Sequence, residues 1–167
     1  GVVGGVEEHR LTLTTYSRID AKHEIVAWVR LLALAVSEPD ARWVAELTGK
    51  TGMVRLVAPP AEQAIGLFGA LVDVYSRGMR YPLGLPPKTA RAFATQAMRG
   101  SDETVLRSAL RAADTEWAGR FPERDDRWWV SLLGPDASLA RLDHLNTLRY
   151  WAPRVWGPVL RAKGLLA

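Results

Sequence analysis

The sequence contains no cysteine, and that absence excludes several kinds of chemistry at once. A chain without thiols forms no disulfides, holds no metal through thiolates and has no cysteine nucleophile. Histidine is also scarce: only His9, His23 and His144 occur, and no two share a metal-ligand spacing such as H-x-x-x-H. No apolar run approaches the ~20 residues that a membrane-spanning helix needs. The composition therefore argues against most classes of metalloenzyme and against all thiol chemistry.

What the chain does have is the composition of an ordinary folded domain. Its 167 residues are 48% hydrophobic and 24% charged, and its 7 Trp, 4 Tyr and 3 Phe are enough aromatic mass to build a core. We expect one domain over residues 1–167. Because the sequence begins at Gly1 rather than Met and enters a strand at once, we expect a piece cut from a longer polypeptide.

The net charge of +4 is unevenly placed along the chain. Residues 1–87 carry 9 basic and 9 acidic side chains, whereas residues 88–167 carry 13 basic and 9 acidic ones. Of the 22 basic residues, 18 are Arg, whose guanidinium groups match phosphate geometry. The second half is thus a candidate for contact with nucleic acid. The alternative is a set of solvated arginines that reflects genome base composition.

The beginning of the chain predicts a hairpin followed by a helix. Residues 1–6 and 11–17 are rich in β-branched types and read as two strands joined by a polar turn. Ser17 and Asp20 have the S-x-x-D spacing of a capping box, which predicts a helix directly after them. This helix ends before Pro39.

A second hairpin is predicted from the strands 42–47 and 53–57. Gly49-Lys50-Thr51 between them resembles the end of a phosphate-binding loop, but that pattern needs a glycine five residues before Gly49, and the sequence has none there. The following residues are also strand rather than helix, so no helix N-terminus would face a phosphate. We therefore interpret this segment as a hairpin turn.

Pro59-Pro60 opens a long predicted helix that runs to about Met79. One apolar stripe follows it at helical spacing and is widened by three further apolar residues. The stripe consists of Ile65, Phe68, Val72, Tyr75 and Met79, and the widening residues are Leu67, Leu71 and Val74. A face this wide predicts a helix that is buried on more than one side.

After a rigid connector at 81–87 the sequence predicts helices only. We expect them at about 88–99, 102–118, 125–133 and 138–150, with a last short one near 153–162 that Gly157-Pro158 interrupts. The expected architecture is a small sheet covered by helices, of the α/β or α+β class, over 1–87, and a basic helical extension over 88–167.

Five basic residues are candidate contacts for DNA or a protein partner: Lys50, Arg55, Arg99, Arg107 and Arg111. The first two belong to the second hairpin. Arg107 and Arg111 share a helix face, whereas Gly100-Ser101 separates them from Arg99. A solvated surface is the alternative for all five.

Two further features have structural interpretations that we favour. Trp128-Trp129, Trp151 and Trp156 are able to stack on bases, but in a helical segment we expect them to seal the core. His144 follows Asp143, yet adjacent helical residues do not face each other, and no serine is placed as a nucleophile for a triad.

An ordered set of segments resembles the C-terminal domain of the RecC family, the gamma subunit of the bacterial exodeoxyribonuclease V, or RecBCD helicase–nuclease. The resemblance is strongest in the long helix and its flanks, and it extends weakly in both directions. The matching segments are Ala61-Glu62-Gln63-Ala64, Tyr75, Arg77-Gly78-Met79, Pro82-Leu83 and Leu85-Pro86, with Trp28 and 42–57 upstream and Trp128 and 156–160 downstream.

The resemblance implies a fold of the PD-(D/E)xK nuclease type. Such nucleases carry an Asp on one strand and an acid-x-Lys on the next, which hold Mg²⁺ and activate water. Here these positions fall near Gly4, Thr15 and Ser17, and we expect no carboxylate or lysine in either strand. Glu7 and Glu8 are expected in the turn at the wrong end of the hairpin. Asp20-x-Lys22 has the right spacing but is expected in the first turn of a helix.

The implied function is therefore that of a nuclease-like domain without nuclease chemistry. It would be a scaffold and DNA-path domain that works with RecB and RecD in the bacterial cytoplasm, in double-strand break repair by homologous recombination. It would hold no metal or cofactor itself, since ATP and Mg²⁺ serve the partner subunits. Two alternatives stay open: a free-standing nucleic-acid-binding module and an active PD-(D/E)xK nuclease.

Overall fold

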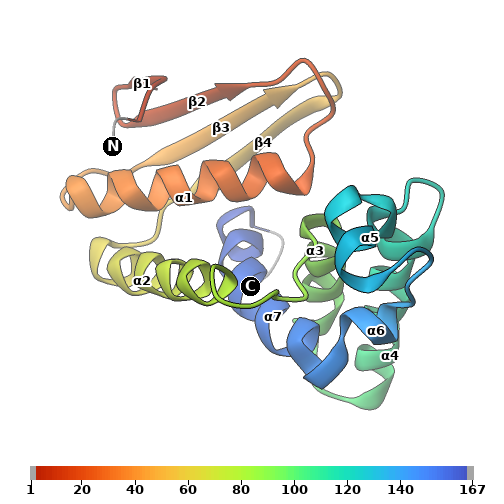
Figure 1. Cartoon of the computed structure of the whole chain (residues 1–167). Helices are drawn as coiled ribbons and strands as arrows, with labels where there is room; N and C mark the ends of the chain where they lie inside the picture. The colour runs from red at the N-terminus through yellow and green to blue at the C-terminus, as the bar shows by residue number, and fades with distance from the viewer. Residues whose placement is uncertain (1–2, 165–167) are drawn as a thin grey trace. The chain divides into compact units, whose positions relative to one another are not determined.

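The computed structural model describes residues 3–164, which divide into two compact units. Unit 1 comprises residues 3–80 and 158–164, and unit 2 comprises residues 81–157. Unit 1 contains a four-stranded sheet and unit 2 is helical, so the chain has the expected mixed α/β class (Figure 1). In the part of the chain that is described, no helix is long and apolar enough to cross a membrane.

The sheet of unit 1 follows the order of its strands in the chain. The strands are β1 (Val6–Glu7), β2 (Arg10–Thr14), β3 (Val44–Gly49) and β4 (Gly52–Val57). β1–β2 and β3–β4 pair antiparallel, and β2–β3 pair parallel. Both predicted hairpins are confirmed. The first strand is shorter than expected, and residues 1 and 2 of its predicted range lie outside the described residues.

Strand alternation gives the sheet one apolar face and one exposed face. Leu11, Ala45, Leu47 and Leu56 are almost fully buried beneath the helix α1 (Ala21–Ser37). The opposite face is exposed at the hydroxyls of β2 and along β4. In Figure 1, α1 lies between the sheet and the helix α2 (Ala61–Gly78). α1 is therefore the central layer of unit 1.

The start of α1 differs from the prediction in its capping residue. Asp20, not Ser17, is the N-cap, and its partner in the capping box is His23. The Asp20 carboxylate accepts from the Ala21 N–H at 2.6 Å, and His23 Nδ1 accepts from the Asp20 N–H at 3.0 Å. A short acceptor side chain at the N-cap satisfies a free N–H group at the start of the helix, as expected. The residue that does so is Asp20, three positions later than predicted.

A buried ion pair joins α1 to the last residues of unit 1. Lys163 Nζ donates to Glu24 Oε1 at 2.8 Å, and the two side chains are only 16% and 3% exposed. The two residues are 139 positions apart in sequence. Since a charge buried in an apolar layer needs a partner, this pair fixes residues 158–164 against α1.

Unit 2 is built from the helices that follow the connector. They are α3 (Pro87–Ala97), α4 (Glu103–Ala118), η1 (Glu123–Asp125), α5 (Arg127–Leu133), α6 (Leu139–Leu142), η2 (His144–Asn146) and α7 (Thr147–Ala162), the last of which continues into unit 1. The predicted helices near 88–99, 102–118 and 125–133 are confirmed.

The last two helix predictions were right that this region is helical but wrong in their bounds. The range 138–150 is divided among α6, η2 and the start of α7, and α7 runs through Gly157-Pro158 without interruption. Proline removes one helical N–H and crowds the preceding turn. The helix continues because Trp156, Val159 and Leu160 on either side of that pair are buried, and tertiary burial outweighs local propensity.

The core of unit 2 is the packed pair α3 and α4, in which Phe93 and Trp117 are buried. Trp117 Nε1 donates to the Ala137 carbonyl at 2.8 Å, so its one polar atom is satisfied. The Glu123 carboxylate accepts from the Lys88 and Thr89 N–H groups at 3.0 and 2.8 Å. A distant carboxylate thus caps α3, which begins at two prolines and has no side-chain cap of its own.

The buried ion pair yields a prediction about stability. Replacing Lys163 with Met leaves the Glu24 carboxylate buried without this partner, so we expect the free energy of unfolding to fall by about 3–5 kcal/mol in urea denaturation. Lys50→Met, on an exposed turn residue, is the matched control and should change stability by less than about 0.5 kcal/mol. A Lys163→Met variant as stable as the wild type would show that the ion pair does not stabilise unit 1.

Candidate functional site

The three positions that the resemblance would assign to nuclease catalysis carry no acid and no lysine. Gly4 precedes β1, and Thr15 and Ser17 follow the end of β2 with their hydroxyls 2.9 Å apart. Asp20 is occupied as the N-cap of α1, and Lys22 is exposed in its first turn, as predicted. Hydroxyl groups at Thr15 and Ser17 are weak substitutes for the carboxylates that hold Mg²⁺.

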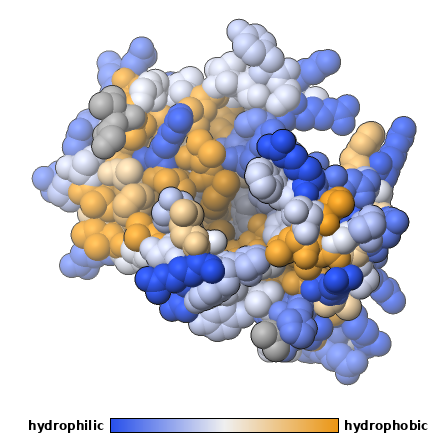
Figure 2. Space-filling model, in the orientation of Figure 1, coloured by the Kyte–Doolittle hydropathy of each residue, from blue (hydrophilic) through white to orange (hydrophobic). Residues whose placement is uncertain are grey.

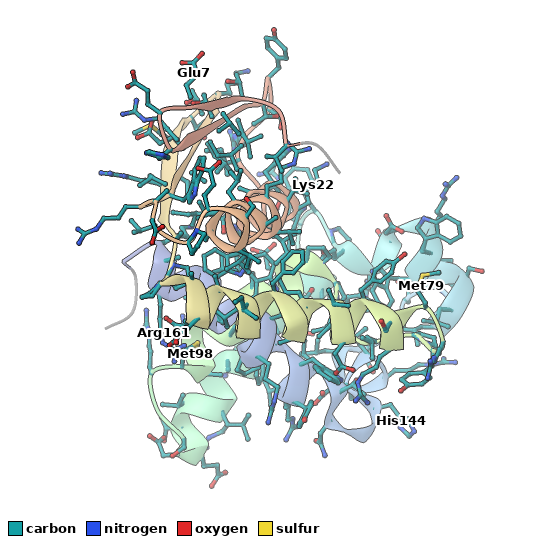
Figure 3. The ribbon with its side chains drawn as sticks, turned by 90° about the vertical axis from the view of Figure 1, so that its left-hand side faces the viewer. Glu7, Lys22, Met79, Met98, His144 and Arg161 are labelled. Carbon is teal, nitrogen blue, oxygen red and sulfur yellow. The ribbon has the colours of Figure 1, made fainter. Side chains whose placement is uncertain are left out.

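Glu7 was expected in the turn of the first hairpin, but it is the last residue of β1. Of the two acids, Glu8 is the one that lies in the turn, where it has a positive φ of 45°. Glu7 pairs across the hairpin with Arg10 and is exposed. Figure 3 shows Glu7 and Lys22 on separate elements, pointing away from each other. Among residues 3–164, no three His, Asp or Glu side chains are grouped so that they could hold a metal ion.

A small pocket of about 260 Å³ lies where the parallel strands β2 and β3 end. It is lined by Leu13, Thr14, Thr15, Lys22, His23, Val26, Leu47 and Thr48. The pocket is mainly apolar, with three hydroxyls and one ammonium group at its rim. His23 contributes a nitrogen that already accepts a backbone hydrogen bond. The pocket has no acid among these residues and is smaller than a typical ligand site.

The five candidate basic residues are all exposed, and they are divided between the two units. Lys50 lies in the β3–β4 turn and Arg55 on β4, directly across from Glu46 on β3. In unit 2, Arg107 and Arg111 share one side of α4, and Arg107 lies 4.0 Å from Glu103. Arg99 lies beyond the end of α3, as the break at Gly100-Ser101 predicted. Of these five described residues, Arg107 and Arg111 are the pair that shares a helix.

Of the aromatic residues considered for stacking, Trp156 is buried as predicted but Trp128 is not. Trp128 is 69% exposed, with the Arg127 guanidinium 4.8 Å from its ring centre. Asp143 does not orient His144; it accepts from the Leu148 N–H at 3.0 Å and from Arg149 Nε at 2.7 Å, and thereby fixes the start of α7. Asp143 thus has a structural role at the start of α7.

The main exposed apolar feature of unit 1 is a stripe along α2, here called the α2 ridge. It consists of Ile65, Phe68, Val72, Tyr75 and Met79. Four of these are strongly exposed, at 58% for Ile65, 50% for Val72, 68% for Tyr75 and 70% for Met79. Phe68 is half-buried. Figure 2 shows hydrophobic side chains across the α1 and α2 region of unit 1, and Figure 3 shows Met79 at the end of α2.

The expectation that α2 is buried on more than one side was therefore wrong. α2 packs on α1 through Ala64, its only buried residue, and through the half-buried Leu67, Leu71 and Val74. α1 is already covered by the sheet on its other side, so α2 has one main neighbour in unit 1 and one free apolar face. Periodicity reports that a face is apolar, and it does not report whether the chain itself covers that face.

Two glycines flatten the exposed side of α2. Gly66 and Gly69 lie in the helix interior, and a Cβ built at either position meets no atom within 4 Å. Glycine costs about 0.5–1 kcal/mol against Ala in a helix. Neither residue is needed for a positive φ or for close packing within the chain. These glycines are the one signal in the sequence that could have indicated an open face.

Comparison with known proteins places the chain among RecC sequences. The sequence model of the RecC C-terminal domain matches residues 1–98. RecBCD enzyme subunit RecC of Mycolicibacterium smegmatis (strain ATCC 700084 / mc(2)155) is 32% identical over 98% of this chain. The same subunit of Mycobacterium tuberculosis (strain ATCC 25618 / H37Rv) is 31% identical over 98% of it. The chain spans 16% of the length of each of these relatives, and the α2 ridge lies within the residues that the family model matches.

The open face of α2 predicts an unusual response to substitution. Gly66→Ala and Gly69→Ala should each raise the free energy of unfolding by about 0.5–1 kcal/mol, because both added methyl groups enter open space. Chemical denaturation of the isolated chain measures this. A loss of stability in Gly69→Ala alone would mean that the chain already covers the α2 ridge in solution.

Proposed function

This chain belongs to the RecC C-terminal domain family, and from that premise we propose that it is a non-catalytic structural domain of a RecC subunit. Its role would be to dock partner proteins of a RecBCD-type helicase–nuclease, and to help form the path of DNA through that assembly. The process served would be double-strand break repair by homologous recombination in the bacterial cytoplasm. The curated relatives are named as subunits of the RecBCD enzyme.

The α2 ridge is the observation that carries this proposal. A domain that acts by docking needs an exposed apolar surface, whereas one that acts mainly on DNA needs a continuous basic one. Here four large apolar side chains are half or more exposed along one helix. The candidate basic residues, by contrast, are dispersed, and Arg107 lies beside a carboxylate. The balance favours protein docking as the main role and DNA contact as a secondary one.

The non-catalytic part of the proposal is supported by side-chain chemistry. A PD-(D/E)xK nuclease needs carboxylates and a lysine where this chain has Gly4, Thr15 and Ser17. The carboxylate of Asp20, three residues after Ser17, already accepts a hydrogen bond from the first N–H of α1. We propose that the first hairpin and α1 derive from a nuclease-like fold, and that ATP and Mg²⁺ act in the partner subunits.

Association with partner subunits tests the docking role. We expect this chain, co-expressed with the RecB and RecD subunits of its own source, to co-purify with at least one of them at moderate salt. A Val72→Asp/Tyr75→Asp variant should lose the association, because it places two charges on the α2 ridge. Thr12→Asp/Thr14→Asp, on the exposed strand face, is the matched control. Association that is indifferent to the α2 substitutions would contradict the proposal.

A nuclease assay tests the absence of catalysis. Purified chain with Mg²⁺ or Mn²⁺ should leave linear single- and double-stranded DNA intact. Binding to either DNA should be weak and should not show the steep salt dependence of a free-standing nucleic-acid-binding module. Cleavage that is abolished by Asp20→Ala would instead identify an active nuclease.

A further inference from the structure

A second pocket of unit 1 has hydrogen-bond donors on several sides. Its volume is about 660 Å³, and it lies between the segment that joins α1 to β3 and the segment that joins β4 to α2. Its polar lining residues are Asp40, Arg42, Trp43 and Arg55, and the rest of its lining is alanine, valine and proline. A concave space of this size, with a few polar groups in an apolar wall, is typical of a ligand site.

Trp43 brings a donor to this pocket that the chain does not satisfy. The residue lines the pocket and is 2% exposed, and its Nε1 has no hydrogen-bond partner among residues 3–164. Its ring packs edge-to-face on His9, with 5.3 Å between the ring centres, and its carbonyl accepts from the Ala58 N–H at 2.9 Å. A buried donor without an acceptor is costly. An oxygen of a bound ligand would remove that cost.

Two guanidinium groups line the same pocket, from Arg42 before β3 and from Arg55 on β4. Both side chains are exposed, and neither makes an ion pair within the described part of the chain. Glu46, which pairs with Arg55 across the strands, lies 3.8 Å from Arg10 Nε instead. A guanidinium group without a carboxylate partner is available to an oxyanion, which it can bind through two parallel N–H groups.

The start of α2 adds backbone donors to the pocket. Pro60 is the N-cap of this helix, which has no side-chain cap, and both Pro60 and Ala61 line the pocket. The free N–H groups of the first turn and the helix dipole favour an anion here. Two exposed acids oppose it: Asp40 at the pocket and Glu62 in the first turn of α2. The donors outnumber these acids.

We propose that this pocket binds a phosphate group through Arg42, Arg55 and the N-terminus of α2, with the Trp43 N–H as a further donor. A phosphate presents more acceptor oxygens to such a set of donors than a carboxylate does. The phosphate is either free or part of a DNA strand, and the chemistry that binds it is the same. The inference does not depend on the docking role, because the α2 ridge begins at Ile65, beyond the residues that line the pocket.

Nuclear magnetic resonance of the whole chain, labelled with ¹⁵N, tests the site directly. The sequence has 7 Trp, and the indole N–H signal that disappears in Trp43→Phe belongs to Trp43. Inorganic phosphate, titrated against chloride at constant ionic strength, should move this signal until it saturates. Acetate at the same concentrations should move it much less, because it offers fewer acceptor oxygens to the donors.

Two double variants with the same change of charge form the matched comparison. Arg42→Gln/Arg55→Gln should weaken phosphate binding by about tenfold or more. Arg18→Gln/Arg30→Gln, at exposed residues of unit 1 outside the pocket lining, should change it less than about twofold. If Trp43→Phe does not fold, the rise in melting temperature that phosphate causes in each of these proteins gives the same comparison.

The acid at the pocket provides a variant with the opposite effect. Asp40→Asn removes a negative charge beside the bound anion, so it should strengthen phosphate binding by about twofold to threefold. Asp73→Asn, on an exposed residue of α2 outside the pocket lining, is its control and should leave the affinity unchanged.

A short single-stranded DNA, with and without a 5′-phosphate, distinguishes the sources of the group. If the phosphorylated strand alone moves the Trp43 signal, the site takes a free or terminal phosphate. If both strands move it and Arg42→Gln/Arg55→Gln abolishes the effect, the site takes the backbone. A Trp43 signal that responds to none of these probes, or equally to acetate, overturns the proposal. Phosphate binding that is unchanged in Arg42→Gln/Arg55→Gln overturns it as well. Association with RecB and RecD is measured separately, so its failure leaves this inference standing.

Discussion

The buried contact between Glu24 and Lys163 is the constraint on which unit 1 depends. The ion pair buries a charge on α1, which lies between the sheet and α2. To reach Glu24, residues 158–164 must pack against the first part of the chain. With the sheet on one side and the ion pair, α2 and the returning segment on the other, α1 is packed on both sides. Its largest apolar residues, Trp28, Leu31 and Leu32, are almost fully buried as a result.

The exposed α2 ridge is a consequence of this arrangement. α2 has only the remaining surface of α1 to pack on within unit 1, and that surface covers one side of an apolar helix. A ridge of large side chains and a row of small flanking residues is left exposed to solvent. An exposed apolar face of this kind is typical of a surface that makes contacts beyond unit 1.

Local patterns predicted the elements better than the contacts between them. Alternation predicted both hairpins, and prolines and apolar spacing predicted α2, α3 and α4, because these signals act within a few residues. The cap of α1 was misplaced because Ser17 and Asp20 offer competing acceptors. Gly157-Pro158 was expected to interrupt a helix because both residues disfavour helices locally. The helix continues because neighbouring residues are buried by parts of the chain that are distant in sequence. The sequence itself shows that Gly4, Thr15 and Ser17 are not acids. The exposure of α2 could not be predicted, because a buried helix and an exposed one can carry the same apolar stripe.

Hydrogen–deuterium exchange tests the central claim, that this chain is a docking domain whose contact surface is α2. The measurement compares the chain alone with the chain bound to its partner subunits. We expect the strongest gain in protection in the peptides covering residues 61–79, with the β3–β4 turn and the exposed side of α4 little changed. Protection confined to that turn and to the arginines of α4, with α2 exchanging as in the free chain, would contradict the account.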